Sequence, residues 1–322
     1  MKTALIAAAS LLVLAIPSLA AEQCGSLNIV STVQIETPND AAARVPVSIG
    51  GQAFTFRLST GGSQSSISSA VADKLNLPRR VSALGLLNTE GDTSNTVVLA
   101  PDFQIGTAHF GKVTLRQMIK DPPADEPQGW LATDLLRAFD VELDFAASRM
   151  NLISRDHCAE GVVYWPSKTM AKIPMRIGDD NRIVFKIKLD GHELDATLET
   201  GVGRTTLTRP VAESVFGVTE SSPGAKPTEK SNRFRYRFGT MSLEGLSVLN
   251  PDITIVPDAA ANVPKHGRSH MQAEMHVHQA PPLRIGMSTL RQLHIYIDYH
   301  NQTLYFTPAK PDDGQVSEAA GE

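Results

Sequence analysis

The sequence predicts an all-β protein built from two similar lobes. Three observations support this prediction: the chain length, a turn-rich composition and an internal duplication. The 322 residues include 23 Gly and 20 Pro but only 6% aromatic residues, which favours many turns and short strands. At roughly 150 residues per domain, the chain is long enough for two domains that each bury a core.

Two stretches that lie 140 residues apart (47 to 187) carry the same pattern. Residues 47–61 (VSIGGQAFTFRLSTG) and 187–201 (IKLDGHELDATLETG) alternate apolar and polar side chains on both sides of a Gly-containing turn. Such alternation is typical of a β-hairpin. Both hairpins end in the dipeptide Thr-Gly, so the same local structure is expected twice.

A second block repeats 154 residues later (136 to 290). Residues 136–145 (LRAFDVELDF) match residues 290–299 (LRQLHIYIDY), and each copy predicts a short helix, a strand, a turn and a final strand. Because the two blocks recur in the same order, we expect two equivalent lobes. We place them at residues 44–156 and 173–308.

The first residues have the features of an export signal. A basic start, an apolar core too short to cross a bilayer and small residues at positions 18 and 20 predict a signal peptide over residues 1–20. An uncleaved anchor is the alternative. The remaining segments are an N-terminal arm at 21–43, a linker at 157–172 and a flexible acidic tail at 309–322. We expect an exported protein, periplasmic or secreted, whose mature chain has no membrane span.

Cys24 and Cys158 are the two cysteines of the chain. In an exported protein an even cysteine count favours a disulfide, and two unpaired thiols are the alternative. The formal net charge of −4 does not indicate the basic surface that binding to nucleic acid requires. No Gly-rich phosphate loop, Cys-rich metal site or nucleophile elbow is present, so no cofactor is expected.

Two weaker patterns allow two interpretations each. Four histidines lie between His266 and His278, and they could ligate a transition metal, but their generic spacing favours a polar loop. Residues 233–238 (RFRYRF) predict a strand with arginines on one face and aromatics on the other. That strand either covers a cleft and attracts anionic ligands or, as we favour, forms an amphipathic hairpin with a solvated basic face.

The repeated hairpins resemble the active-site loops of aspartic peptidases of the retropepsin and pepsin type, which read Asp-Thr/Ser-Gly. Residues 130–136 (WLATDLL) and 284–290 (RIGMSTL) resemble the apolar segment and the helix that follow in this family. The resemblance covers most of the mature chain. It implies the bilobal aspartic-peptidase fold, in which two retropepsin-like β-barrel lobes with short helices are related by a pseudo-twofold axis.

The resemblance fails at the two positions that carry the chemistry. In that family each lobe supplies one aspartate, and the two aspartates share a proton. The matching residues here are Ser59 and Glu199. Serine has no carboxylate, and glutamate moves its carboxylate outward, where a misplacement of about 1 Å can cost on the order of 10²-fold in rate. Asp144 and Asp298 form another symmetric pair, which we expect to be turn residues away from this site.

The loop scaffold is retained although the carboxylate pair is missing. By the resemblance, Thr60 and Thr200 cross-link the two loops, and Gly61 and Gly201 allow their tight turns. We therefore expect a catalytically impaired pseudopeptidase that holds an extended polypeptide in the inter-lobe cleft by strand addition. The alternative is an active aspartic-type endopeptidase in which Glu199 activates a water. Since one chain supplies both lobes, a monomer is expected.

Overall fold

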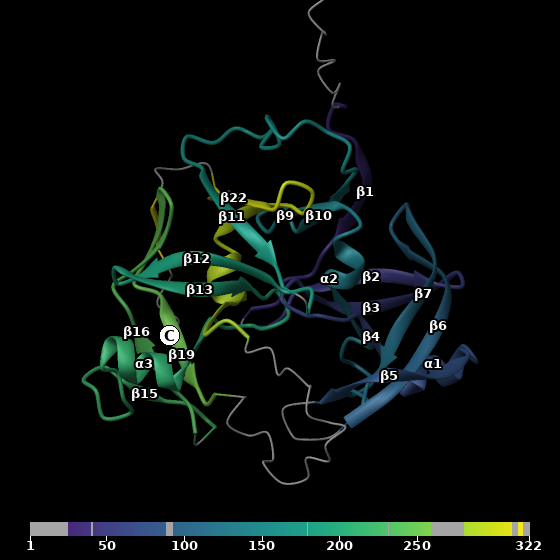
Figure 1. The fold of residues 1–322 in the computed structure, drawn as a ribbon, viewed down its shortest axis with the longest axis horizontal. Coiled ribbons are helices and arrows are strands. Elements are labelled where there is room, and N and C mark those ends of the chain that lie inside the picture. The colour runs from purple at the N-terminus through teal and green to yellow at the C-terminus, as the bar shows by residue number, and fades with distance from the viewer. Residues whose placement is uncertain are drawn as a thin grey trace, which may run out of the picture.

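Two lobes lie side by side and are joined along one sheet (Figure 1). The computed structural model describes residues 25–39, 41–87, 93–178, 180–230, 232–258, 280–310 and 315–317. The predicted signal peptide, Cys24 and the His266–His278 segment lie outside the described residues. Strands dominate the described residues and the helices are short, which confirms the all-β prediction.

The first lobe is a small barrel. Its strands hydrogen-bond in the order β2-β3-β8-β4-β7-β6-β5, and β2 also pairs with β6, which closes the ring. Val45, Val47 and Ile49 on β2 all point into the core, as the alternation predicts. The elements are β2 (Arg44–Ile49), β3 (Gln52–Ser59), β4 (Ser66–Ile67), α1 (Ser69–Lys74), β5 (Arg79–Leu87), β6 (Thr93–Ile105), β7 (Ala108–Gln117), β8 (Gly129–Ala132) and α2 (Thr133–Leu136).

The second lobe repeats this plan. The β12–β13 hairpin corresponds to β2–β3, and β13 runs parallel to β20 as β3 runs parallel to β8. The elements are β12 (Ile183–Leu189), β13 (His192–Leu198), β14 (Thr206–Thr208), α3 (Arg209–Phe216), β15 (Lys226–Pro227), β16 (Phe234–Arg237), β17 (Thr240–Leu243), β18 (Leu246–Leu249), β19 (Asp252–Val256), β20 (Leu283–Ile285) and α4 (Met287–Leu290).

The alternating segment at 233–238 forms β16 of this lobe. Phe234 and Phe238 are buried and Arg237 is exposed, so the strand is amphipathic as predicted. Arg235 donates to Asp252 at 3.1 Å, and β16 pairs with β15 and β19. Arg237 therefore faces solvent, whereas Arg233 and Arg235 are partly buried.

A shared antiparallel sheet joins the lobes, and the second repeated block of each lobe lies at its centre. Its six strands follow in the order β1-β10-β9-β21-β22-β11. Leu143 on β9 lies opposite Ile295 on β21, so the two repeats meet edge to edge. The bounds are β1 (Ile29–Gln34), β9 (Asp140–Asp144), β10 (Arg149–Ile153), β11 (Ala171–Ile177), β21 (Leu293–Asp298) and β22 (Thr303–Pro308).

The predicted arm, linker and tail all supply strands. The arm contributes β1 at one edge of the shared sheet, and the end of the linker contributes the start of β11. In the tail, predicted to be flexible, β23 (Gln315–Ser317) pairs in parallel with β18. Each of these segments provides hydrogen-bond partners for backbone N–H and C=O groups that would otherwise be unpaired at a strand edge.

The backbone beside Cys158 lies against the start of the described chain. Gly25 donates to the Asp156 carbonyl at 2.9 Å and accepts from the Cys158 amide at 3.1 Å. Cys158 is disulfide-bonded, but Cys24 lies outside the described residues, so their pairing stays a prediction. No helix in the described part of the chain has the length and apolarity to cross a bilayer.

A buried polar cluster links the lobes within the shared sheet. Glu142 on β9 accepts hydrogen bonds from His294 on β21 at 2.8 Å, from Asn151 at 2.8 Å and from the Tyr164 hydroxyl. Trp165 stacks on His294 with ring centroids 3.7 Å apart. The linker thus covers this face of the sheet. Burial alone would raise the pKa of Glu142, but these three donors outweigh it and lower the pKa below its usual value.

The Glu142 cluster predicts loss of stability in acid. Because the folded protein lowers the pKa of Glu142, its contribution is complete above the ordinary value of 4.5 and is lost as the pH falls further. Glu142→Gln should lower the free energy of unfolding at neutral pH by about 3 kcal/mol, since it breaks a buried pair. Urea titrations at several pH values should show a shallower acid slope for this variant. The exposed Glu213→Gln should behave like the parent, and an unchanged acid slope in Glu142→Gln would disprove the assignment.

Candidate functional site

Two equivalent loops, one from each lobe, meet at the centre of the molecule. The first loop leaves β3 at Ser59 and the second leaves β13 beyond Leu198, so Glu199 occupies the position equivalent to Ser59. The Ser59 hydroxyl donates to Oε1 of Glu199 at 2.9 Å. The structure therefore brings together the two residues at which the sequence departs from an aspartate pair.

The two threonines brace these loops against each other. Thr60 Oγ1 donates to the Leu198 carbonyl at 3.0 Å and accepts from the Thr200 amide at 3.2 Å. In return, Thr200 Oγ1 donates to the Leu58 carbonyl at 2.8 Å and accepts from the Thr60 amide at 3.2 Å. Both threonines are fully buried, so these hydrogen bonds satisfy backbone groups that water cannot reach.

The glycines after the threonines make room for the Ser59–Glu199 pair. A Cβ atom on Gly201 would lie 2.7 Å from Oε1 of Glu199 and 2.9 Å from Oγ of Ser59, and one on Gly61 would lie 2.6 Å from Oε2 of Glu199. The Gly201 amide also donates to Oε1 of Glu199 at 3.0 Å. Any larger residue at position 61 or 201 would therefore collide with the carboxylate of Glu199.

Glu199 supplies the single carboxylate of this pair, and the residue is buried. Burial raises the pKa of Glu199 above its usual value. The hydrogen bonds from Ser59 and Gly201, and the positive charges of Arg284 and Arg182, oppose this rise without cancelling it. The protonated form of Glu199 therefore persists to a higher pH than that of an exposed glutamate.

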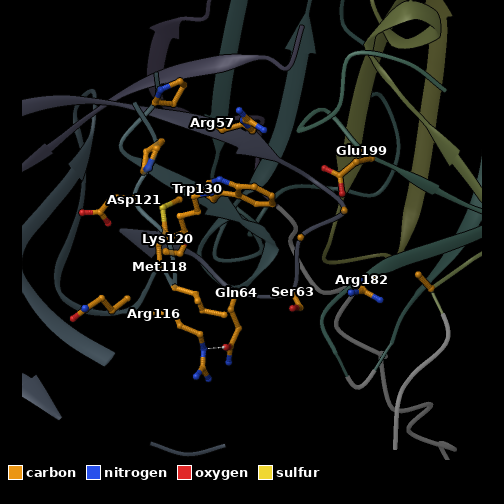
Figure 2. A pocket seen from close by; sticks show the side chains of 18 of the residues that line it. Arg57, Ser63, Gln64, Arg116, Met118, Lys120, Asp121, Trp130, Arg182 and Glu199 are labelled. Carbon is orange, nitrogen blue, oxygen red and sulfur yellow. Dashed lines mark hydrogen bonds between the residues drawn. The ribbon is translucent and has the colours of Figure 1, made fainter. Parts of the chain in front are cut away.

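A groove of about 630 Å³ opens beside Glu199 and extends across the first lobe (Figure 2). Figure 2 shows Glu199 at one end, Arg57 and Trp130 near the middle, and Arg182 on the second lobe. Arg57 lies over the Trp130 ring, 5.4 Å from its centroid. The chain segment after β7 forms another part of the lining. Its residues are Met118, Ile119, Lys120, Asp121, Pro122 and Pro123.

The other aspartates do not restore a carboxylate pair. Asp121 lines the groove, but its two oxygens accept from the amides of Ser69 and Ala70 at the start of α1. Asp144 accepts from the Ala147 amide and Asp298 from the Asn301 amide, so both are turn residues, as predicted. Across the described ranges, no group of three or more His, Cys, Asp or Glu could hold a metal ion.

Sequence reasoning missed the residues that give the groove its charge. Arg182, Arg284 and Arg57 all line it, but none was selected as a candidate. The repeat itself contained a signal, because Arg284 and Trp130 begin the two matching blocks and Arg57 lies beside the first loop. Only the parallel pairing of β8 with β3 and of β20 with β13 shows that these positions face the groove.

Residues 45–134 match the family model described as aspartyl protease. The matched stretch runs from β2 to α2 and includes Ser59, Thr60 and Gly61. No curated protein matches the chain. The match covers most of the first lobe, and the second lobe repeats the strand plan of the matched segment.

The threonine brace predicts a large effect of a nearly isosteric change. Thr60→Val removes a buried hydroxyl and leaves the Leu198 carbonyl and the Thr200 amide without their partner, which should lower the free energy of unfolding by about 3 kcal/mol. Thr303→Val, at a more exposed position on β22, should change it by less than about 1 kcal/mol. Chemical denaturation measures both values. Equal effects of the two changes would show that the brace does not stabilise the site.

Proposed function

We propose that this protein, which carries an aspartic-peptidase-like domain, binds extended polypeptides in its groove and does not hydrolyse them. The single observation that supports this function best is the hydrogen bond from Ser59 to Glu199. It occupies the place where a peptidase of this family has two carboxylates. We further propose that the protein is exported and monomeric, since the chain has a signal-like start and contains both lobes.

The Ser59–Glu199 pair lacks half of the required acid–base chemistry. Hydrolysis by a carboxylate pair needs one group that takes a proton from water and a second that donates a proton to the substrate carbonyl. Ser59 has no group that titrates near neutral pH, and its single proton is already directed to Glu199. Ser59 is also fully buried, so it cannot donate to a substrate in the groove without breaking this bond.

The groove is suited to binding. Its volume of about 630 Å³ lies within the range of sites that enclose small ligands, about 300–1,000 Å³. It combines an exposed aromatic ring, Trp130, with apolar side chains such as Met118 and Ile119 and with several charged groups. A mixed lining of this kind can hold both the backbone and the side chains of an extended chain.

One observation favours a second candidate, an active hydrolase. Glu199 lines the groove, and burial raises its pKa, which brings a carboxyl group closer to the pKa that suits a general base near neutral pH. In this alternative Glu199 alone activates a water, and the Ser59 hydroxyl orients its carboxylate.

Removal of the carboxylate separates the two candidates. We expect both the parent and Glu199→Gln to bind a casein-derived peptide mixture, because an amide keeps the shape of the side chain. Neither should cleave it during prolonged incubation from acidic to neutral pH, as followed by mass spectrometry. The matched control is Glu193→Gln, an exposed glutamate on β13, the strand that leads to Glu199. Cleavage by the parent and by Glu193→Gln that is absent in Glu199→Gln would establish the hydrolase instead.

Restoration of both aspartates tests whether the missing carboxylates cause the impairment. The double change Ser59→Asp with Glu199→Asp supplies a pair that can share a proton. We expect cleavage of unfolded protein at acidic pH at least about 10²-fold faster than by the parent, the usual size of one acid–base contribution. Each single variant should stay inactive. A folded, peptide-binding double variant without activity would show that the scaffold lacks more than the two carboxylates.

A further inference from the structure

Because of the duplication, each lobe contributes to the groove a pair of side chains at equivalent strand positions. On the first lobe Arg57 lies opposite Trp130 in the parallel register of β3 and β8. On the second lobe Thr197 lies opposite Arg284 in the register of β13 and β20. All four residues line the groove. The two pairs thus occupy equivalent positions in the two lobes. In the first lobe the arginine, Arg57, lies over the aromatic ring of its partner, whereas the partner of Arg284 in the second lobe is a threonine.

Arg284 is a partly buried cation in the lining of the groove. Within the described residues it has neither a hydrogen bond nor an ion pair, although the negative charge of Glu199 acts on it from nearby. Burial lowers the pKa of Arg284, which reflects the cost of keeping this charge away from water. An anion that enters the groove beside Arg284 would relieve that cost.

Thr197 supplies an independent polar group at the same place. Its side chain is 1% exposed, and in the part of the chain that the structure describes its Oγ1 atom has no hydrogen-bond partner. Buried hydroxyl groups almost always have a partner in folded proteins. A ligand oxygen between Thr197 and Arg284 would accept hydrogen bonds from both.

Arg182 adds a second positive charge to this end of the groove. It precedes β12, forms an ion pair with Asp180 at 3.1 Å and lies near Glu199 (Figure 2). Its charge lowers the pKa of Arg284 and stabilises the charged form of Glu199. Arg182 also lines an adjoining cavity of about 410 Å³, so it stands where the groove continues along the second lobe.

The lining as a whole favours negative ligands. Five cationic residues line the groove, against Glu199 and Asp121, and Asp121 already accepts two backbone amides. The chain carries a formal charge of −4, so this local excess of positive charge runs against the overall balance. The five are Arg57, Arg116, Lys120, Arg182 and Arg284.

We propose that Arg284 and Thr197, assisted by Arg182, form a subsite for a carboxylate of the bound polypeptide. This inference rests on the proposed function, because it names the class of polypeptide that the groove selects: segments with Asp or Glu beside the Ser59–Glu199 pair, or with a free C-terminus there. A planar carboxylate suits the two parallel donors of a guanidinium, and its remaining oxygen positions suit the hydroxyl of Thr197.

Three pools of fluorescent decapeptides test this subsite by fluorescence anisotropy with the full mature chain. The first pool has a fixed central Glu and an amidated C-terminus, the second a central Gln and an amidated C-terminus, and the third a central Gln and a free C-terminus. We expect a carboxylate to tighten binding by about tenfold or more over the second pool, as for a hydrogen bond to a charged group. Preference for the first pool identifies side-chain carboxylates as ligands, and preference for the third identifies the C-terminus.

Two variants assign the preference to the subsite. Arg284→Met should abolish the preference for a carboxylate, so that the first and third pools bind no more tightly than the second. Thr197→Val should reduce the preference by about threefold or more without unfolding the protein, because it removes an unpartnered buried hydroxyl. The control Arg237→Met, at an exposed position on β16, should retain the full preference.

The outcomes separate this inference from the proposed function. Equal affinity for all three pools would overturn the carboxylate subsite and leave polypeptide binding intact. Absence of binding to every pool would overturn both. A carboxylate preference that survives in Arg284→Met and in Thr197→Val would refute the assignment to these residues.

Discussion

The reciprocal bracing of the two central loops is the constraint on which the rest of the structure depends. Thr60 and Thr200 each donate to a backbone carbonyl of the opposite lobe and accept from the opposite amide. These bonds fix the ends of β3 and β13 against each other in the buried interior. They bring residues 59 and 199 within hydrogen-bond distance, and the groove begins at that point.

The scaffold is symmetric, whereas the chemistry placed on it is not. Each lobe supplies a hairpin, a braced threonine, a glycine and a parallel strand that lines the groove. At the paired positions, however, one lobe has Ser59 and the other Glu199. The same contrast recurs one step away, where the first lobe pairs Arg57 with Trp130 and the second pairs Thr197 with Arg284. Such asymmetry makes the parts of the groove that the two lobes supply chemically different.

Electrostatics at the centre follow from burial. Glu199 loses hydration and its pKa rises, while Arg284 loses hydration and its pKa falls. The two charges stabilise each other without a direct contact, so each keeps the capacity to bind a further group. In the shared sheet Glu142 shows the opposite result, because three hydrogen-bond donors reach its carboxylate and lower its pKa despite burial. At these two sites the balance between burial and hydrogen bonding sets the direction of the pKa shift.

Consecutive residues are enough to predict the repeated elements of this protein. Alternation predicted the hairpins at 47–61 and 187–201, and the repeat established that Ser59 and Glu199 occupy equivalent positions. These features depend on local periodicity, which is written in consecutive residues. The resemblance to aspartic peptidases added the expectation that the two loops meet, which periodicity alone does not contain.

How the two repeats combine becomes visible only in the folded chain. The shared sheet recruits β1 from the predicted arm and β11 from the predicted linker, and the linker covers the Glu142–His294 contact. Arg182, Thr197 and Arg284 become a group only because β12, β13 and β20 lie together at the groove. A side chain's burial and partners depend on residues far away in the sequence, and no local pattern encodes which of those residues will be its neighbours.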